Sequence, residues 1–432
     1  MKVAIVGSGI SGLGCAHALL AERQHGIQVT LFESEHRPGG HTNTVDVRLD
    51  GIEHPVDTGF LVFNERTYPN LIRLFDELDV PTAKSDMSFA VSVPAGRGGG
   101  RLEWAGTDLN SVFAQRRNLA SPRFLAMVAD ILRFNRQATR IARGDETAEE
   151  QTLGEFLDRH RYGENFRRWY LLPMAAAIWS CPMRTMLAYP LAMFLRFCDN
   201  HGLLQVNDRP QWFTVAGGAR QYVRKILSRL PDVRLGSPVL EVTRNEAAGK
   251  VNVRTAHGVE AFDQVVLACH SDQSASLLAD ADIAERRLLG DVRYQPNRAV
   301  LHTDARLMPR LRSVWSSWNY LSDGGDEPDV SVTYLLNKLQ PLPFETPVLV
   351  SLNPLVEPDP AQVIAEFEYA HPIFDASTAA AQQRLPEIQG RRRVWLAGAW
   401  TGFGFHEDGL KSGLTVAKAL GALAHRPQRL AA

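Results

Sequence analysis

Three glycines near the amino terminus have the spacing of a phosphate-binding turn. The segment GSGISG places Gly7, Gly9 and Gly12 between the apolar run Val3 to Val6 and a stretch of helix-forming residues. The first glycine allows a tight bend, the second lets the backbone approach a pyrophosphate, and the third lets helix and strand pack closely. A helix that begins at Ser11, directly after Ile10, then offers unpaired N–H groups and its positive dipole end to phosphates. The turn therefore predicts a dinucleotide site that includes these two residues.

An acidic residue closes the strand that follows. Residues Gln28 to Glu33 complete a β–α–β unit with Gly26 at the return, and Glu33 lies about 20 residues beyond Gly12, the spacing at which a carboxylate hydrogen-bonds an adenosine ribose. An acid there would also repel a 2′-phosphate, which disfavours NADP. We therefore expect Glu33, with Ser34 beside it, at the adenosine end of the site.

The composition excludes several classes of protein. The chain has 432 residues with 47 basic and 48 acidic side chains, so no net field attracts nucleic acid. Its length suggests two domains, and its first apolar run is too short for a signal peptide. The cysteines have no metal-ligand spacing, which predicts reduced thiols in a cytoplasmic protein and no metal site. They are Cys15, Cys181, Cys198 and Cys269.

The most apolar region, residues 171–195, is broken by prolines at 173, 182 and 190 and by one charge, Arg184. Proline interrupts helices, and no uninterrupted run reaches the roughly 20 residues that a bilayer requires. We expect a buried helical cap, or one that touches a membrane surface as a peripheral protein does.

The remaining pattern alternates between sheet and helix. Val45, Val47 and Leu49 alternate before Asp50-Gly51, which predicts a hairpin. Helical spacing dominates residues 105–200, strand-like spacing returns at 239–269, and a helix is expected at Ala361 to Tyr369. The sequence thus predicts an α/β fold with discontinuous domains. Residues 1–80, 201–288 and 391–432 form a Rossmann-like cofactor domain, and residues 81–200 and 289–390 form an interleaved α+β substrate domain.

A second glycine pair indicates which dinucleotide is bound. In RPGGH, Arg37 with Gly39 and Gly40 suits another contact on the same pyrophosphate, and His41 follows directly. The GxGxxG turn, the acidic Glu33 and this RxGG element follow one another in the sequence, which in this respect resembles the flavin amine oxidase and carotenoid desaturase superfamily. The resemblance implies FAD as the cofactor and a fold of the two-dinucleotide-binding-domain flavoprotein type.

Three later segments carry the same resemblance. DTGF, which contains Thr58 and Gly59, stands where the family has an element beside the flavin, and GGARQYV is followed by SPVLEV, where the backbone of Val239 would meet the adenine. LAGAW and HEDGLKSG resemble the segment that closes over the isoalloxazine. There the resemblance implies cofactor contacts from Gly398, Phe405, Asp408, Gly409 and Leu410, the last two through N–H groups that face flavin N1 and O2. One departure is Ala399, because the family has an acid there for the ribityl chain.

Residues that could manage a proton lie near these segments. His406 in FGFHEDG has the intrinsic pKa of a proton carrier, and His41 is a comparable candidate. In amine oxidases a lysine holds a water near flavin N5; Lys338 is the candidate here, with Arg298 as the other cation considered. Glu407 and Asp408 can equally serve as caps of the last helix.

The apolar cap indicates a hydrophobic substrate, although aromatic and methionine side chains are usually buried for packing. The residues expected to line a channel are Trp169, Met174, Ile178, Trp179, Phe194, Trp315 and Trp318.

Within the superfamily the sequence most resembles bacterial flavoproteins that accompany cyclopropane-fatty-acid synthase-like methyltransferases, on the segments GFLVFNERTYPN, PNRAVLHTDARLMP and GFHEDGLKSG. This kinship implies hydride transfer at flavin N5 with a lipid or fatty-acyl substrate, and a methyltransferase of that kind as a partner. Two alternatives stay open: a flavin amine oxidase, and a non-catalytic flavin-binding partner of the methyltransferase.

Overall fold

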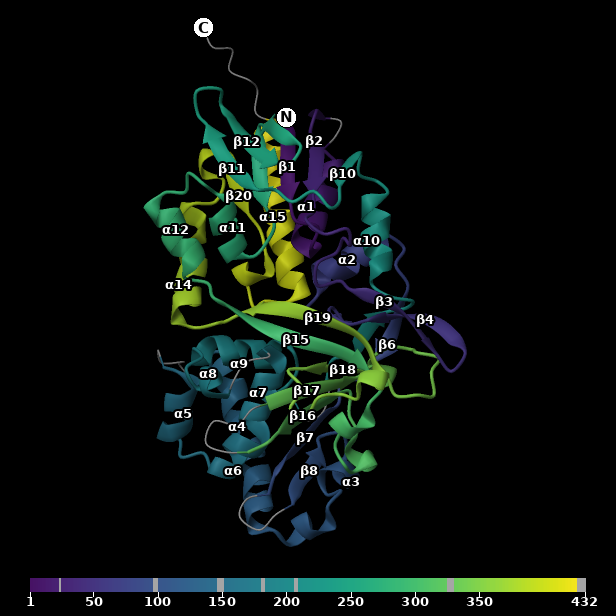
Figure 1. Cartoon of the computed structure of the whole chain (residues 1–432). Helices are drawn as coiled ribbons and strands as arrows, with labels where there is room; N and C mark the ends of the chain where they lie inside the picture. Colours follow the sequence, from purple (N-terminus) through teal and green to yellow (C-terminus); the bar gives the residue numbers. More distant parts are fainter. Residues whose placement is uncertain are drawn as a thin grey trace.

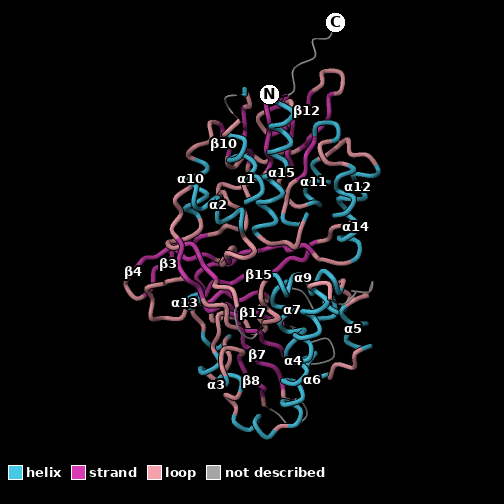
Figure 2. Tube along the Cα trace, turned by 180° about the vertical axis from the view of Figure 1, so that it is seen from behind, coloured by secondary structure: helices cyan, strands magenta, loops and turns pink. Residues whose placement is uncertain are grey.

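The computed structural model describes residues 1–22, 25–95, 100–145, 151–179, 183–205, 209–324 and 330–425. A parallel sheet with flanking helices forms one half of the molecule, and a larger sheet with a layer of helices forms the other (Figure 1). Two long strands, β15 (Tyr294–His302) and β19 (Val363–Pro372), cross the molecule between the halves (Figure 1), and β15 is seen there from behind as well (Figure 2).

The parallel sheet holds the predicted β–α–β unit. Its strand order is β10-β2-β1-β14-β20, and every neighbouring pair is parallel. Val3, Ala4 and Ile5 are fully buried, as expected for a continuous apolar run covered on both faces. The Rossmann-like prediction is confirmed. The strands are β1 (Lys2–Val6), β2 (Gln28–Phe32), β10 (Asp232–Arg234), β14 (Gln264–Leu267) and β20 (Val394–Leu396).

Two helices from opposite ends of the chain pack against each other over this sheet. They are α1 (Ile10–Leu20) and α15 (His406–Ala424). A side chain at Gly413 would collide with the Ser11 carbonyl, and one at Gly14 would collide with Leu410. Glycine therefore permits the close approach that brings the first turns of both helices to the same end of the sheet.

Smaller antiparallel sheets flank this half. The predicted hairpin is confirmed as β3 (Thr44–Leu49) and β4 (Ile52–Asp57), joined by Asp50 and Gly51, which both have positive φ. The other strands are β11 (Glu241–Asn245), β12 (Lys250–Thr255) and β13 (Gly258–Phe262) in one sheet, and β5 (Phe63–Asn64), β6 (Thr82–Ser85) and β9 (Trp212–Val215) in another.

The seven-stranded sheet corrects one prediction. The helix expected at Ala361 to Tyr369 is wrong, because these residues belong to β19, which pairs with β15. Ala365 and Phe367 turn inward while Glu366 and Glu368 are exposed, a period of two that helical spacing does not produce. The sheet order is β19 (Val363–Pro372), β15 (Tyr294–His302), β18 (Leu349–Leu352), β17 (Val330–Leu335), β16 (Trp318–Ser322), β7 (Phe89–Pro94) and β8 (Arg101–Ala105).

A helical layer lies beside this larger sheet (Figure 1) and contains the described part of residues 171–195, whose apolar side chains are mostly buried. No described helix is both long enough and apolar enough to cross a bilayer. Cys181 and Pro182 lie outside the described residues. The layer consists of α4 (Pro122–Ala142), α5 (Leu153–Arg159), α6 (Glu164–Phe166), a π-helical turn (Arg167–Leu171), α7 (Leu172–Trp179), α8 (Met183–Leu187) and α9 (Leu191–Asn200).

The other helices connect the sheets: α2 (Pro69–Glu77), α3 (Leu109–Val112), α10 (Arg220–Leu227), α11 (Ser271–Leu277), α12 (Ile283–Gly290), α13 (Leu336–Leu339) and α14 (Ala376–Arg384).

Candidate active site

The glycine-rich turn between β1 and α1 has one open position. A Cβ on Gly7, whose φ is +108°, would lie 2.5 Å from the Ala268 carbonyl oxygen, and a Cβ on Gly12 would collide with the Gly7 carbonyl. Gly9 differs, since no protein atom lies within 4 Å of the position its Cβ would take. No side chain caps the start of α1. The turn therefore leaves an open cradle whose N–H groups at the start of α1 have no partner in the part of the chain that the structure describes, which fits a pyrophosphate.

Glu33 lies at the carboxyl end of β2, beside this turn. Its carboxylate accepts hydrogen bonds from the Ser8 backbone N–H (2.9 Å) and the Ser8 hydroxyl (2.6 Å), while Ser34 donates to its other oxygen (3.1 Å). Further along, Val239 is buried and its backbone N–H has no hydrogen-bond partner among the described residues. Both features fit the adenosine half of FAD, because a carboxylate can accept from a ribose hydroxyl and a free N–H can donate to a base.

The RPGGH loop packs directly on the glycine-rich turn. A Cβ on Gly40 would lie 3.3 Å from the Gly9 Cα, and the Gly39 N–H donates to the Ser8 hydroxyl (3.0 Å). The Arg37 guanidinium donates to the Gly40 carbonyl (3.0 Å) and so stabilises the conformation of the RPGGH loop from within. The two glycine-rich segments thus form one surface.

Residues 57–60 support the loop from behind. The Thr58 N–H donates to the Asn43 carbonyl (2.9 Å), and a side chain at Gly59 would collide with the His41 carbonyl. Asp57 is buried and accepts from the Ala219 N–H (2.9 Å) at the start of α10 and from the Thr44 hydroxyl (2.5 Å). Burial raises the pKa of Asp57 to about 7. Asp57 therefore joins the start of α10, which follows Gly217-Gly218, to β3.

The first turn of α15 completes the site from the carboxyl terminus. His406 stacks on Phe60 and contacts Tyr222, whose hydroxyl lies 2.8 Å from His406 Nε2. Gly409 packs so closely on Ile10 that a Cβ would come within 2.8 Å of it. Gly398 reaches the same helix, because its N–H donates to the Ser412 hydroxyl (2.9 Å). Leu410 is fully buried between α15 and α1.

Glu407 and Asp408 separate into two roles. Asp408 accepts from the Phe405 N–H (3.0 Å) and caps α15, and burial raises its pKa to about 6. Glu407 instead accepts from the N–H groups of Asn70 and Leu71, each at 3.0 Å, and so caps α2. The proposal that both residues cap the last helix is correct for Asp408 and wrong for Glu407.

Phe405 stacks on Phe197 of α9 at 5.0 Å and links the helical layer to the site.

The site also contains side chains that the sequence analysis missed. Around His41 lie the rings of Tyr369 (5.2 Å between centroids), His371 (5.5 Å) and His270 (6.2 Å), and His270 stacks on Tyr294. Apart from Tyr369 and His371, which are two residues apart, no short spacing relates these residues, because they come from the RPGGH loop, the start of α11, β15 and β19. Only the alternation along β19 could have suggested that Tyr369 and His371 share a face.

Burial keeps these imidazoles neutral. It lowers the pKa of His406 to about 3 and that of His371 to about 4, and it lowers the pKa of His270 as well. Burial is also the main cause that holds the pKa of His41 well below its ordinary value. Neutral imidazoles can both donate and accept hydrogen bonds, so the site offers hydrogen-bonding groups without positive charge.

Lys338 does not join this group. Its side chain is exposed on α13, near Asp86, which is held on the other side by Ser88 and Ser317. Arg298, the other cation considered, pairs with Glu357 and Glu366 at the surface. Among the described residues, the cluster around His41 contains no lysine.

A narrow cavity opens beside His371, between the large sheet and the helical layer, with room for about one water molecule. Its lining is mostly apolar. Of the residues expected to line a channel, only Trp179 is among them; Met174 and Phe194 are buried in the core of the helical layer, and Trp315 and Trp318 pack around the large sheet. The lining residues are Trp179, Thr185, Met186, Tyr189, Gln295, His371, Pro372, Ile373 and Phe374.

A Rossmann-like half with an open glycine cradle, closed by a carboxy-terminal helix and joined to a sheet with a helical cap, defines a flavin-dependent oxidoreductase. The sequence model of the flavin containing amine oxidoreductases matches residues 10–334. The chain belongs to this family, which confirms the resemblance. It is an enzyme, and its cofactor is FAD.

Solved structures share the fold over almost the whole chain. Cyclohexylamine oxidase from Brevibacterium oxydans IH-35A is 16% identical with a TM-score of 0.66, covering 98% of this chain and 99% of that one. A CLA-producing fatty acid isomerase from P. acnes is 15% identical with a TM-score of 0.66, covering 96% and 98%. Putrescine oxidase bound to putrescine is 15% identical with a TM-score of 0.68, covering 98% and 99%. No curated protein sequence matches the chain.

When bound, FAD supplies two-electron chemistry by accepting or donating a hydride. The chain's own residues supply the rest. The glycine turn and the RPGGH loop would hold the dinucleotide, the first turn of α15 would close the site, and the neutral histidines could orient a bound group through hydrogen bonds.

Proposed function

We propose that this enzyme transfers a hydride between flavin N5 and a hydrophobic, lipid or fatty-acyl substrate that carries an acceptor oxygen. The observation that carries the proposal is the lining of the cavity beside His371. Among the residues that the structure describes, no carboxylate lines it, so no described side chain there would compensate the charge of an ammonium group.

The polar groups of the cavity favour an acceptor oxygen. Trp179 lines it, and the buried Nε1–H of Trp179 has no acceptor among the described residues. A buried donor without a partner is costly, and a carbonyl or carboxylate oxygen of a substrate would satisfy it. His371, neutral because burial lowers its pKa to about 4, could donate or accept beside it. The remaining lining is mostly apolar, which suits an alkyl chain. Because the cavity has room for only about one water molecule, the flexible side chain of Met186 would have to move to admit such a chain.

The alternative is an amine oxidase, the activity named for two of the similar structures. An uncharged amine could enter the same cavity. The Trp179 Nε1–H would then have a hydrogen-bond acceptor only if the lone pair of the amine nitrogen accepted from it. The third hypothesis, a non-catalytic flavin-binding protein, is set aside because the family is one of enzymes. A partnership with a fatty-acyl-modifying methyltransferase stays a prediction.

Anaerobic stopped-flow reduction of the FAD-loaded enzyme separates these activities. We expect flavin bleaching with fatty acids or acyl lipids, including the product of a cyclopropane-fatty-acid synthase-like methyltransferase, and none with primary amines. If the enzyme works in the reductive direction, the reduced enzyme should instead be reoxidised by an unsaturated acyl chain. Reaction with amines alone would overturn the proposal.

A matched pair of variants tests the cavity itself. Ile373→Trp fills the cavity from its wall, and Ile364→Trp makes the same change at an exposed position on β19. We expect kcat/KM for the acyl substrate to fall at least tenfold in Ile373→Trp and to stay unchanged in Ile364→Trp, with full flavin content in both. Equal activity of the two variants would show that the substrate binds elsewhere.

A further inference from the structure

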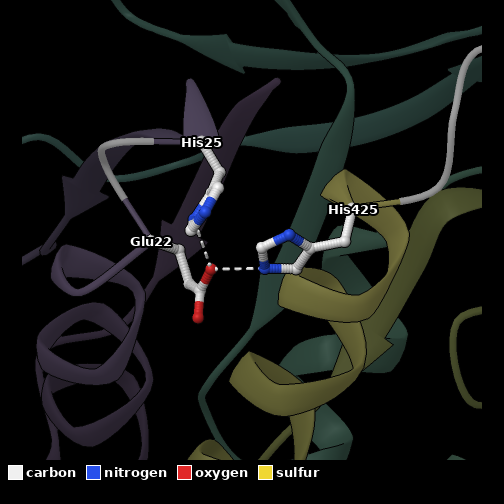
Figure 3. Close-up of side chains that lie close together, drawn as sticks. All are labelled: Glu22, His25 and His425. Carbon is white, nitrogen blue, oxygen red and sulfur yellow. Dashed lines mark hydrogen bonds and ion pairs between the residues drawn. The ribbon is translucent and has the colours of Figure 1, made fainter.

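Two histidines and a glutamate meet on the surface of the Rossmann-like half, far from the cavity. Glu22 follows α1, His25 precedes β2, and His425 follows α15 (Figure 3). One oxygen of Glu22 lies 3.0 Å from His25 Nδ1 and 2.9 Å from His425 Nε2. Glu22 and His425 are 403 residues apart in the sequence, so spacing along the chain could not reveal this cluster.

The donor set is one that transition metals bind. Imidazole nitrogen and carboxylate oxygen are ligands for Zn²⁺, at about 2.0 to 2.2 Å, and four tetrahedral ligands lie about 3.3 Å from one another. Here one donor atom from each residue lies within 4.8 Å of the other two. Both imidazole nitrogens are directed at the same carboxylate oxygen (Figure 3). A small rotation of Glu22 would therefore place a metal ion where three ligands converge.

We propose that Glu22, His25 and His425 bind one divalent transition metal ion of the Zn²⁺ class, with water at the fourth position. The side chains are partly exposed, so the ion can enter from solvent. In its absence the histidines share the Glu22 carboxylate through hydrogen bonds.

The site is structural and takes no part in the redox chemistry. α15 runs from His406 to Ala424, a length of about 28 Å at 1.5 Å per residue, so the metal lies a full helix away from the first turn that closes the cofactor site. It would fasten the carboxyl end of α15 to the loop between α1 and β2. Since the first turn of α15 contacts α1 at the cofactor cradle, the ion would stabilise the helix pair that holds FAD.

The chain provides a matched control. His17 Nε2 and Glu77 Oε2 form another surface pair at 3.2 Å, with one imidazole and one carboxylate only. Two donors bind a metal much more weakly than three, so His17→Ala and Glu77→Gln remove a similar ion pair without removing the proposed site.

The test uses the FAD-loaded full chain without an affinity tag, after treatment with a chelator. We expect calorimetric titration with Zn²⁺ to show one saturable site, and Co²⁺ to give the visible absorption bands of a low-coordinate site. Affinity should fall at least tenfold in Glu22→Gln, His25→Ala and His425→Ala, and should be unchanged in His17→Ala and Glu77→Gln. Zn²⁺ should also raise the unfolding temperature of the wild type and not that of His425→Ala.

Two results would overturn the proposal. One is the absence of saturable Zn²⁺ binding to the wild type, which would leave the cluster as a hydrogen-bonded ion pair. The other is binding that survives in all three cluster variants. Circular dichroism and flavin content establish that each variant is folded, and His425→Gln replaces His425→Ala if the latter loses flavin.

Discussion

The imidazole of His406 lies flat on the ring of Phe60, with the centroids 3.9 Å apart and the planes at 12°. The two residues come from opposite ends of the chain, and their contact joins the segment after β4 to the first turn of α15. The Tyr222 hydroxyl fixes the rotation of the imidazole from the edge. Phe60 packs on the face of the His406 ring and the Tyr222 hydroxyl contacts its Nε2, so the other ring nitrogen, Nδ1, has a single orientation. A fixed orientation of this kind is what proton transfer requires.

Removing the hydroxyl in Tyr222→Phe should disturb this orientation without emptying the site. The variant loses the 2.8 Å contact with His406 and the 2.5 Å contact with Thr42. We expect full flavin content and a substrate-dependent rate of flavin reduction lowered about tenfold, with KM little changed. Stopped-flow absorbance measures the rate, and an unaltered rate would show that His406 does not depend on Tyr222.

The open position at Gly9 makes a sharp prediction about cofactor binding. Gly9→Val should fold, because no protein atom lies within 4 Å of the added Cβ, but its branched side chain would occupy the pyrophosphate cradle. We expect a colourless protein with normal circular dichroism. Gly12→Val should instead be unfolded or insoluble, since its Cβ would collide with the Gly7 carbonyl. Gly9→Val that purifies yellow would refute the assignment of the cradle.

Glu407 should matter for stability more than for cofactor binding. Its carboxylate caps α2 through the N–H groups of Asn70 and Leu71, where Tyr68, the N-cap residue, provides no side-chain hydrogen bond. Glu407→Ala should lower the free energy of unfolding by about 1 to 2 kcal/mol, measured by urea denaturation. The flavin absorbance per mole of protein should not change. Loss of flavin with unchanged stability would assign Glu407 to the cofactor instead.

Acid should destabilise the protein through its buried histidines, and His302 allows this to be measured away from the active site. It is fully buried on β15, its Nδ1 accepts from the Asp304 N–H (3.0 Å), and burial lowers its pKa to about 4. Between pH 6.5 and 4 the unfolded chain therefore takes up a proton that the folded chain does not, so stability falls as the pH falls.

The variant His302→Gln isolates this contribution. The single histidine accounts for up to about 3 kcal/mol at pH 4, and the variant should lose stability less steeply over the same range. Urea denaturation at several pH values, with wild type as the reference, gives the slope. Parallel slopes for the two proteins would contradict the prediction.

Features that depend on neighbouring residues could be predicted from the sequence. The glycine turn, the acid after β2 and the Asp50-Gly51 hairpin are short patterns in which each residue meets a local backbone requirement, such as the positive φ of Gly7 and Gly51. Even so, the segment that forms β19 was expected to be a helix. Over so short a length, its apolar residues fit both the spacing of a helix and the alternation of a strand.

The chemistry around the cofactor could not be predicted in the same way. His41 and His406 were found through the motifs that contain them, whereas His270, His371 and Tyr369 carry no motif. These three meet His41 only when the start of α11 and β19 are placed beside the RPGGH loop. The same holds for Glu407, which caps a helix more than 300 residues away in the sequence. The sequence alone thus determined where the backbone must bend and which dinucleotide it can hold. The tertiary structure decided which side chains share that pocket and which of them stay uncharged, because proximity and burial arise from packing between distant segments.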